Sequence, residues 1–85
     1  MDFKKLLRKI YEMGDVYITI LSDDLEVYND HKIIGRVDNH EKNIQLSFTN
    51  DSILLIRKSQ IEAIRYDPDK ITITKGNGGE IIIEN

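Results

Sequence analysis

Arg57 and Lys58 are the two side chains whose type and position most directly suggest binding chemistry. They open a short polar corner between two apolar stretches, residues 53–56 and 61–66. The first stretch is a run of branched apolar residues, which predicts a strand buried on both faces. A corner between two such strands would hold both cations at one point, where they can bind phosphate and where Arg57 can also stack on a base. The competing interpretation is an exposed strand corner with no binding role.

A second group of candidate side chains is acidic and lies within residues 23–41. Carboxylates and imidazoles can together bind a metal ion, and this segment contains Asp23, Asp24, Glu26, Asp30, His31, Asp38, His40 and Glu41. Their spacing matches no calcium-binding loop, and the chain has no phosphate loop, nucleophile elbow or zinc-binding helix. Acidic turns are more typical of a solvated surface, so we expect no enzyme activity, no metal and no cofactor.

Length and composition limit the classes of protein that remain. The 85 residues are enough for one domain with one modest core, and they include no cysteine for a disulfide or a thiolate metal site. No apolar stretch is long enough to span a membrane, and the N-terminus lacks the apolar centre of a signal peptide. We therefore expect a cytoplasmic protein with no membrane partner. The formal net charge is −3, so binding to nucleic acid would require a local basic patch.

Residues 2–13 are predicted to form a helix that carries such a patch. Its apolar residues recur at three- and four-residue steps and form one stripe, made of Phe3, Leu6, Leu7, Ile10 and Met13. Asp2 is placed to cap the start of the helix, and Gly14 is placed to end it. Four cations lie largely off the stripe, and they are candidate nucleic-acid contacts: Lys4, Lys5, Arg8 and Lys9. The competing interpretation is a solvated helix surface.

From residue 15 onward the apolar residues mostly alternate with polar ones, which predicts short strands joined by tight turns. We expect strands at 16–20, 33–37, 44–48, 53–56, 61–66, 70–75 and 80–84. Residues 22–32 are dense in acids and turn formers, with at most a short strand at Leu25 and Val27. Gly35 indicates a bend or a close backbone approach within its strand. Turns are expected at 49–52 and 67–69, and a loop that admits positive φ at 76–79.

The predicted fold is mostly β and forms a single domain over residues 1–85. An N-terminal helix at 1–14 precedes a small, strongly bent antiparallel barrel at 15–66, and an additional C-terminal hairpin occupies 67–85. A barrel is preferred to a flat sheet because a flat sheet of such Ile-rich strands would leave unpaired edges.

Two short segments resemble the sequence motifs of the Sm-like family, which includes the Sm and Hfq proteins. Residues 35–46, Gly-Arg-Val-Asp-Asn-His-Glu-Lys-Asn-Ile-Gln-Leu, resemble the first Sm motif without a gap. In this comparison His40 stands at the aromatic position of the motif, Glu41 at its Asp and Gln45 at its Asn. The resemblance covers residues 1–66, because a helix followed by a bent five-stranded barrel is also the plan of this family.

Residues 56–61, Ile-Arg-Lys-Ser-Gln-Ile, resemble the second Sm motif and also the Tyr-Lys-His-Ala-Ile segment of Hfq proteins. Arg57, Lys58 and Ser59 then take the positions of the Tyr, Lys and His. Asn43 stands where many relatives carry a residue that stacks on a base, which predicts weaker stacking here. The usual Gly between the first two strands is replaced by acidic residues, and the hairpin at 76–85 lies outside the ordinary five strands.

The resemblance implies an SH3-like or Sm-like barrel that assembles into a ring of six or seven copies and binds single-stranded RNA. It also implies a pocket for each base, lined by the loop at 40–45 and the corner at 57–59. The candidate RNA-binding residues are His40, Asn43, Gln45, Arg57, Lys58 and Ser59. His40 could stack on a base, and the amides of Asn43 and Gln45 could read base edges. The competing interpretations are a turn residue for His40 and an outward strand residue for Gln45.

The leading functional hypothesis is therefore a non-enzymatic, ring-forming protein that binds single-stranded RNA. The alternative is an oligomeric structural or protein-interaction module with no nucleic-acid role, which the acidic charge of the barrel favours. Apolar strands at 53–56, 61–64 and 81–83 could pair edge to edge between subunits. By the resemblance to Sm-like rings, the seam between neighbouring subunits would involve residues 53–56 and 61–66. The extra hairpin would either extend this seam or cover it.

Overall fold

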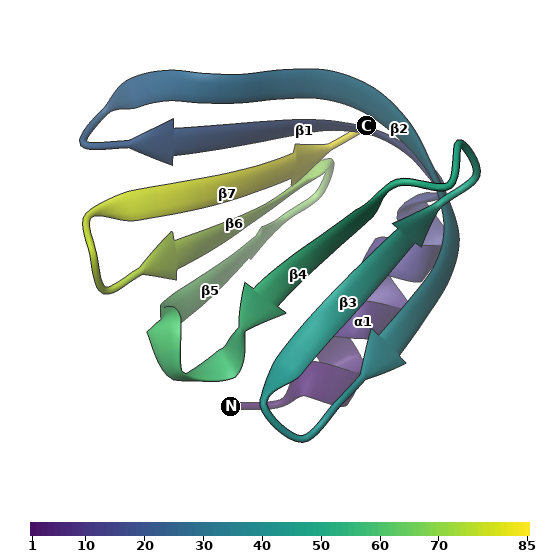
Figure 1. The fold of residues 1–85 in the computed structure, drawn as a ribbon, viewed down its shortest axis with the longest axis horizontal. Coiled ribbons are helices and arrows are strands. Elements are labelled where there is room, and N and C mark those ends of the chain that lie inside the picture. Colours follow the sequence, from purple (N-terminus) through teal and green to yellow (C-terminus); the bar gives the residue numbers. More distant parts are fainter.

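The computed structural model describes residues 1–85 and contains one helix followed by one open antiparallel sheet of seven strands (Figure 1). The elements are α1 (Phe3–Met13), β1 (Asp15–Ser22), β2 (Leu25–Asn39), β3 (Asn43–Phe48), β4 (Ile53–Arg57), a 3-10 turn η1 (Lys58–Gln60), β5 (Ile61–Asp67), β6 (Lys70–Lys75) and β7 (Gly79–Glu84). The prediction of a mostly β chain with an N-terminal helix is confirmed. The helix is too short and too polar to cross a membrane.

Helix α1 begins and ends where the local sequence signals predict. The Asp2 carboxylate accepts a hydrogen bond from the backbone N–H of Lys5 at 3.0 Å, which satisfies one of the free donors of the first turn. Gly14 ends the helix with a φ of 70° and a ψ of −74°, and glycine adopts such a positive φ more readily than any other residue. The apolar stripe faces the core, with the following residues buried: Leu6, Leu7 and Ile10.

The main difference from the predicted strands is the length of β2. The acidic segment expected to form turns is instead the first half of a 15-residue strand. A two-residue turn at Asp23 and Asp24, with φ values of 51° and 66°, connects it to β1. The side chains of residues 25–31 are exposed, so the acidic composition that resembled a loop belongs to a strand that extends beyond the core. Pairing along β1 outweighs the weak strand preference of these residues.

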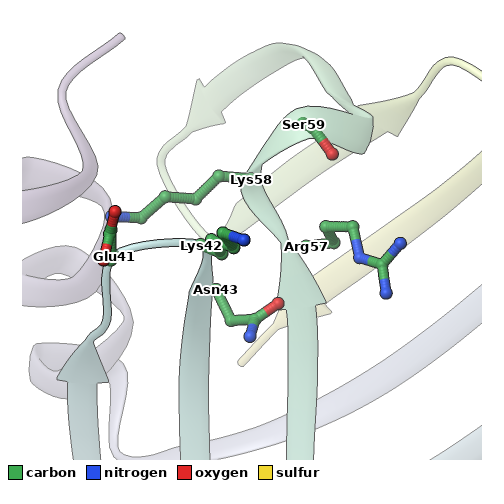
Figure 2. Close-up of a pocket in the computed structure, with 6 residues that line it drawn as sticks. All are labelled: Glu41, Lys42, Asn43, Arg57, Lys58 and Ser59. Carbon is green, nitrogen blue, oxygen red and sulfur yellow. The ribbon is translucent and has the colours of Figure 1, made fainter.

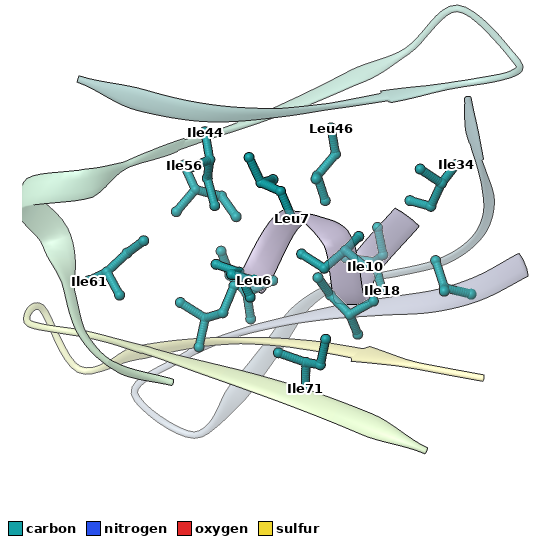
Figure 3. Packing of buried hydrophobic residues seen from close by; sticks show 14 of the residues in the cluster. Leu6, Leu7, Ile10, Ile18, Ile34, Ile44, Leu46, Ile56, Ile61 and Ile71 are labelled. Carbon is teal, nitrogen blue, oxygen red and sulfur yellow. The ribbon is translucent and has the colours of Figure 1, made fainter. Parts of the chain in front are cut away.

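Strand β2 bends at Gly35, as predicted. Its register with β3 shifts between Ile34 and Arg36, and a Cβ atom at Gly35 would lie 3.3 Å from the carbonyl oxygen of Ser47. The first half of β2 pairs with β1 and the second half with β3. The bend thus folds β3 and β4 over the rest of the sheet, and both parts pack with α1 around one apolar core (Figure 3).

The C-terminal hairpin exists as predicted, but it lies inside the sheet. The strand order is β4-β3-β2-β1-β7-β6-β5, because β7 pairs with β1 and β6 pairs with β5. The hairpin is therefore additional to β1–β5, and within the sheet it separates β1 from β5. As a result, β4 and β5 are the two edge strands of the sheet, and η1 connects them directly in the chain.

Strand β4 is not buried on both faces, which corrects a second expectation. Ile56 is 2% exposed, whereas Ile53 and Leu55 are 54% and 52% exposed. An edge strand whose other face meets solvent buries only alternate residues. A run of four apolar residues does not distinguish this arrangement from a fully buried strand, so only the packing could decide it.

Candidate nucleic-acid interface

An open cavity of about 630 Å³ lies where β3 begins and β4 ends (Figure 2). Its lining contains no apolar residue and consists of Glu41, Lys42, Asn43, Arg57, Lys58 and Ser59. The fold thus brings together the loop before β3 and the corner after β4, the two segments that the family resemblance pointed to. Three of the six side chains are cationic and one is acidic, so the cavity carries an excess of positive charge.

Backbone pairing holds the two sides of the cavity together. The N–H of Lys58 donates to the carbonyl of Lys42 at 2.9 Å, and the N–H of His40 donates to the carbonyl of Asn43 at 2.9 Å. Asn43 and Arg57 are direct partners in the β3–β4 ladder. Directly opposed residues of an antiparallel pair project from the same face. The Asn43 amide and the Arg57 guanidinium therefore extend toward the same side of the sheet (Figure 2).

His40 and Gln45 do not line the cavity, but they lie next to it and contact each other. His40 Nε2 and Gln45 Oε1 are 3.1 Å apart, and Gln45 Nε2 donates to Ser47 Oγ at 3.1 Å. Gln45 is two positions along β3 from Asn43, so both point to the outward face. Each end of the Gln45 amide can still make one more hydrogen bond. The amide is thus held in one orientation while it can still bind a ligand.

The four cations predicted on the helix fall into two groups that differ in their surroundings. The Lys5 ammonium lies 4.7 Å from the centre of the Tyr66 ring, and Lys9 lines a smaller cavity beside the same tyrosine. All four cations are exposed, but Lys4 and Arg8 line neither of these cavities. Lys5 and Lys9 therefore face the sheet, whereas Lys4 and Arg8 do not contact it in this way.

Sequence reasoning did not select Lys42 as a binding residue. It stands in a polar turn with no pattern of its own, and its position in the cavity follows from the backbone hydrogen bond to Lys58. No pattern in the sequence identifies it, because its place depends on the β3–β4 register, which opposes Asn43 to Arg57 and so brings their chain neighbours together.

The three cations of the cavity have no acidic partner. The structure contains four ion pairs: His31–Asp15, Lys32–Asp30, Arg36–Asp38 and Arg65–Asp67. None of them includes a residue of the cavity, even though the formal net charge of the chain is −3. The positive charge at this site is therefore available to an anion from outside the chain.

The acidic side chains of residues 23–41 do not assemble a metal site. No group of three or more His, Cys, Asp or Glu side chains lies close enough to hold an ion. Asp30 instead pairs with Lys32 at 3.3 Å, and this hydrogen bond, together with the one from the His31 N–H, holds the pKa of Asp30 below its usual value. Burial alone would lower the pKa of Lys32, but hydrogen bonds with Tyr28 and Asp30 outweigh it and raise the pKa.

Comparison with protein-family models, with curated proteins and with solved structures finds no match to this chain. The resemblance to the Sm-like family consequently rests on the two short motifs at residues 35–46 and 56–61. The geometry and the charge of the cavity are the structural features that bear on function.

Proposed function

We propose that this protein binds single-stranded RNA without catalysing a reaction, and that it does so as a ring of six or seven copies. The observation that carries the RNA assignment is the polar cavity with its three unpaired cations, Lys42, Arg57 and Lys58. Phosphate oxygens are the natural partners of such a group, and a guanidinium can bind two of them at once.

The lining of the cavity favours phosphate over a base as the group bound there. A base pocket in a single-strand site uses aromatic side chains as stacking surfaces, and this cavity contains none. Asn43 and Ser59 supply neutral hydrogen-bonding groups that suit a sugar hydroxyl or a phosphate oxygen. The bases would then lie toward His40 and Gln45 on the neighbouring outward surface, where an imidazole and an amide are linked.

The proposed assembly uses the two edge strands. We infer that the bent sheet is an SH3-like or Sm-like barrel enlarged by the β6–β7 hairpin, because α1 precedes an antiparallel meander of β1 to β4 in which β2 bends at Gly35. The hairpin leaves the outer edges of both β4 and β5 uncovered. Pairing of β4 in one copy with β5 in the next would satisfy these edges, and repetition of such a contact by rotation closes a ring.

A second candidate function has one specific observation in its favour. Ile53 and Leu55 are large apolar side chains that are half exposed on the edge strand β4. Such residues beside an unpaired edge are typical of a contact between proteins. An oligomeric structural or protein-interaction module with no nucleic-acid role would use this surface and would leave the polar cavity empty.

Light scattering on a sizing column, with the ratio of absorbance at the nucleic-acid and protein maxima recorded, tests both candidates. Six or seven copies of the 9.9 kDa chain would give a species of about 60–70 kDa. Nucleic acid in the same peak, removed by a ribonuclease, would support RNA binding. A ring free of nucleic acid that also fails to bind added RNA would favour the structural module, and a monomer would refute the ring.

A further inference from the structure

We propose that a second cavity, on the inner face of the β1–β2 pair, binds a small apolar carboxylate such as a medium-chain fatty acid. The carboxylate of this ligand binds the ammonium of Lys32, and its hydrocarbon chain lies against the apolar wall. The second cavity shares no residue with the polar cavity. The inference therefore does not depend on RNA binding.

The second cavity has a volume of about 360 Å³ and a mainly apolar lining. Six of its eight lining residues are apolar, among them Ile20, Tyr28 and Phe48, and the other two are Lys32 and Ser52. Sites for small molecules are typically clefts of about 300–1,000 Å³ with an apolar lining and a few polar groups that orient the ligand. The size and the lining of this cavity therefore suit a small ligand that is apolar over most of its surface.

The cavity exists because β1 and β2 extend beyond the core. Val16 and Ile18 are buried in the core, and Ile20 lies on the same face of β1. Tyr28 is opposed to Ile20 across the β1–β2 ladder, so it shares this face, yet it is 38% exposed. The inner face thus changes along the two strands from filled core to open apolar surface, which a ligand can cover.

Lys32 places a buried cation at the wall of this cavity. It is only 8% exposed, and its ammonium lies 3.3 Å from Ser52 Oγ and 5.6 Å from the centre of the Phe48 ring. Because Ser52 and Phe48 also line the cavity, these contacts hold the ammonium beside it. Burial acts to lower the pKa of Lys32, but hydrogen bonds with Tyr28 and Asp30 outweigh it and raise the pKa. The side chain is therefore cationic at neutral pH.

A ligand can replace the counter-ion of Lys32. The Asp30 carboxylate lies 3.3 Å from the ammonium, but it does not line the cavity and its side chain is 54% exposed. An exposed carboxylate can turn into water at little cost, and a ligand carboxylate then forms a charge-assisted hydrogen bond with the ammonium in its place. One cation with one replaceable counter-ion suits a monovalent head group, whereas the three cations of the polar cavity suit phosphate.

The test measures the binding of octanoate by calorimetry and locates it by amide NMR spectra of the isotopically labelled protein. Octanol has the same chain without the charge, and acetate has the charge without the chain. We expect octanoate to shift the amide signals of residues that line the cavity. It should bind about tenfold more tightly than octanol, because it adds a hydrogen bond between charged groups. Acetate should give no saturable shift.

Three variants separate the cation from the apolar wall. Lys32→Met removes the charge but keeps a long side chain, so octanoate and octanol should then bind with similar affinity. Asp30→Asn removes the competing carboxylate, so it should tighten octanoate binding several-fold and leave octanol binding unchanged. Lys75→Met is the matched control and should bind octanoate as the wild type does, because Lys75 lies outside the cavity and takes part in no ion pair.

The comparison of octanoate with octanol on the wild type remains decisive even if Lys32→Met does not fold. Absence of saturable shifts at the cavity would overturn the proposal, and so would equal affinities of the wild type for the two ligands. Cavity signals that change with protein concentration alone would assign this surface to a second copy of the chain, which would also overturn it. Titration of the same protein with RNA reports separately on the proposed function.

Discussion

Asn43 of β3 and Arg57 of β4 are direct cross-strand partners, and both line a polar cavity that has no apolar wall. This pairing places a neutral amide beside a guanidinium that has no acidic partner in the chain. The strand ladder determines the positions of these two residues, and the other four lining residues lie in the loop before β3 and in η1.

Replacement of Arg57 and Lys58 together by Ala should weaken binding of single-stranded RNA by about tenfold or more, since hydrogen bonds to charged groups contribute about 1.5–3 kcal/mol each. The slope of log K against log salt should also become shallower by about 1.4. Polarisation titrations at several salt concentrations measure both quantities. The matched control is Arg36→Ala/Arg65→Ala, which removes two cations already paired with aspartates. A similar loss in the control would remove the cavity from the binding site.

Adjacent positions on β4 should respond differently to an introduced carboxylate. Ile56→Asp buries an unpaired charge in the core and should lower the free energy of unfolding by about 3–5 kcal/mol. The Leu55 side chain points outward from the edge strand, so Leu55→Asp should leave the monomer folded. It should nevertheless dissociate the oligomer if β4 forms the contact between subunits. Urea denaturation and light scattering separate the two effects. An unchanged native mass for the folded Leu55→Asp variant would argue against β4 as the contact.

The Asp30–Lys32 pair should make the stability of the protein depend on pH. The pKa of Asp30 is lowered in the folded state, chiefly by the hydrogen bond from Lys32 and then by that from the His31 N–H. The ionised Asp30 carboxylate therefore stabilises the folded state fully at a pH above its usual pKa of 3.8. This stabilisation is lost as the pH falls through the lower pKa of the folded state. Asp30→Asn should lower the stability at pH 7 and reduce the loss on acidification. Equal acid sensitivity in wild type and variant would contradict this assignment.

Two glycines should differ in their tolerance of a side chain. Gly14 has a φ of 70° and open space around a Cβ position, so Gly14→Ala should cost about 1 kcal/mol from backbone conformation alone. Gly76 does not have a positive φ, and a Cβ there would meet only the flexible carboxylate of Glu62 at 3.2 Å. Gly76→Ala should therefore be nearly neutral. Thermal unfolding of both variants provides the comparison, and a larger cost at Gly76 would show that the loop is tighter than its geometry indicates.

Much of the candidate site could be located from the sequence, because the two motif segments are short and each contains its own polar residues. The loop before β3 and the corner after β4 meet as the resemblance implies, and Asn43, Arg57, Lys58 and Ser59 line one cavity. The position of Lys42 in that cavity, and the displacement of His40 and Gln45 to its side, depend on the β3–β4 register. A one-residue change of register would have reversed which side chains face outward.

Local signals in the sequence by themselves determined the ends of α1, the tight turns and the alternation of most strands. Asp2 and Gly14 act within one turn of the helix, and the loop at 76–79 contains Gly78 with a φ of 83°. Only the tertiary structure decided the length of β2, the exposure of Leu55 and the insertion of the hairpin between β1 and β5. The physical reason is that strand pairing joins residues far apart in the chain, and the burial of a side chain depends on which strand and which layer it meets.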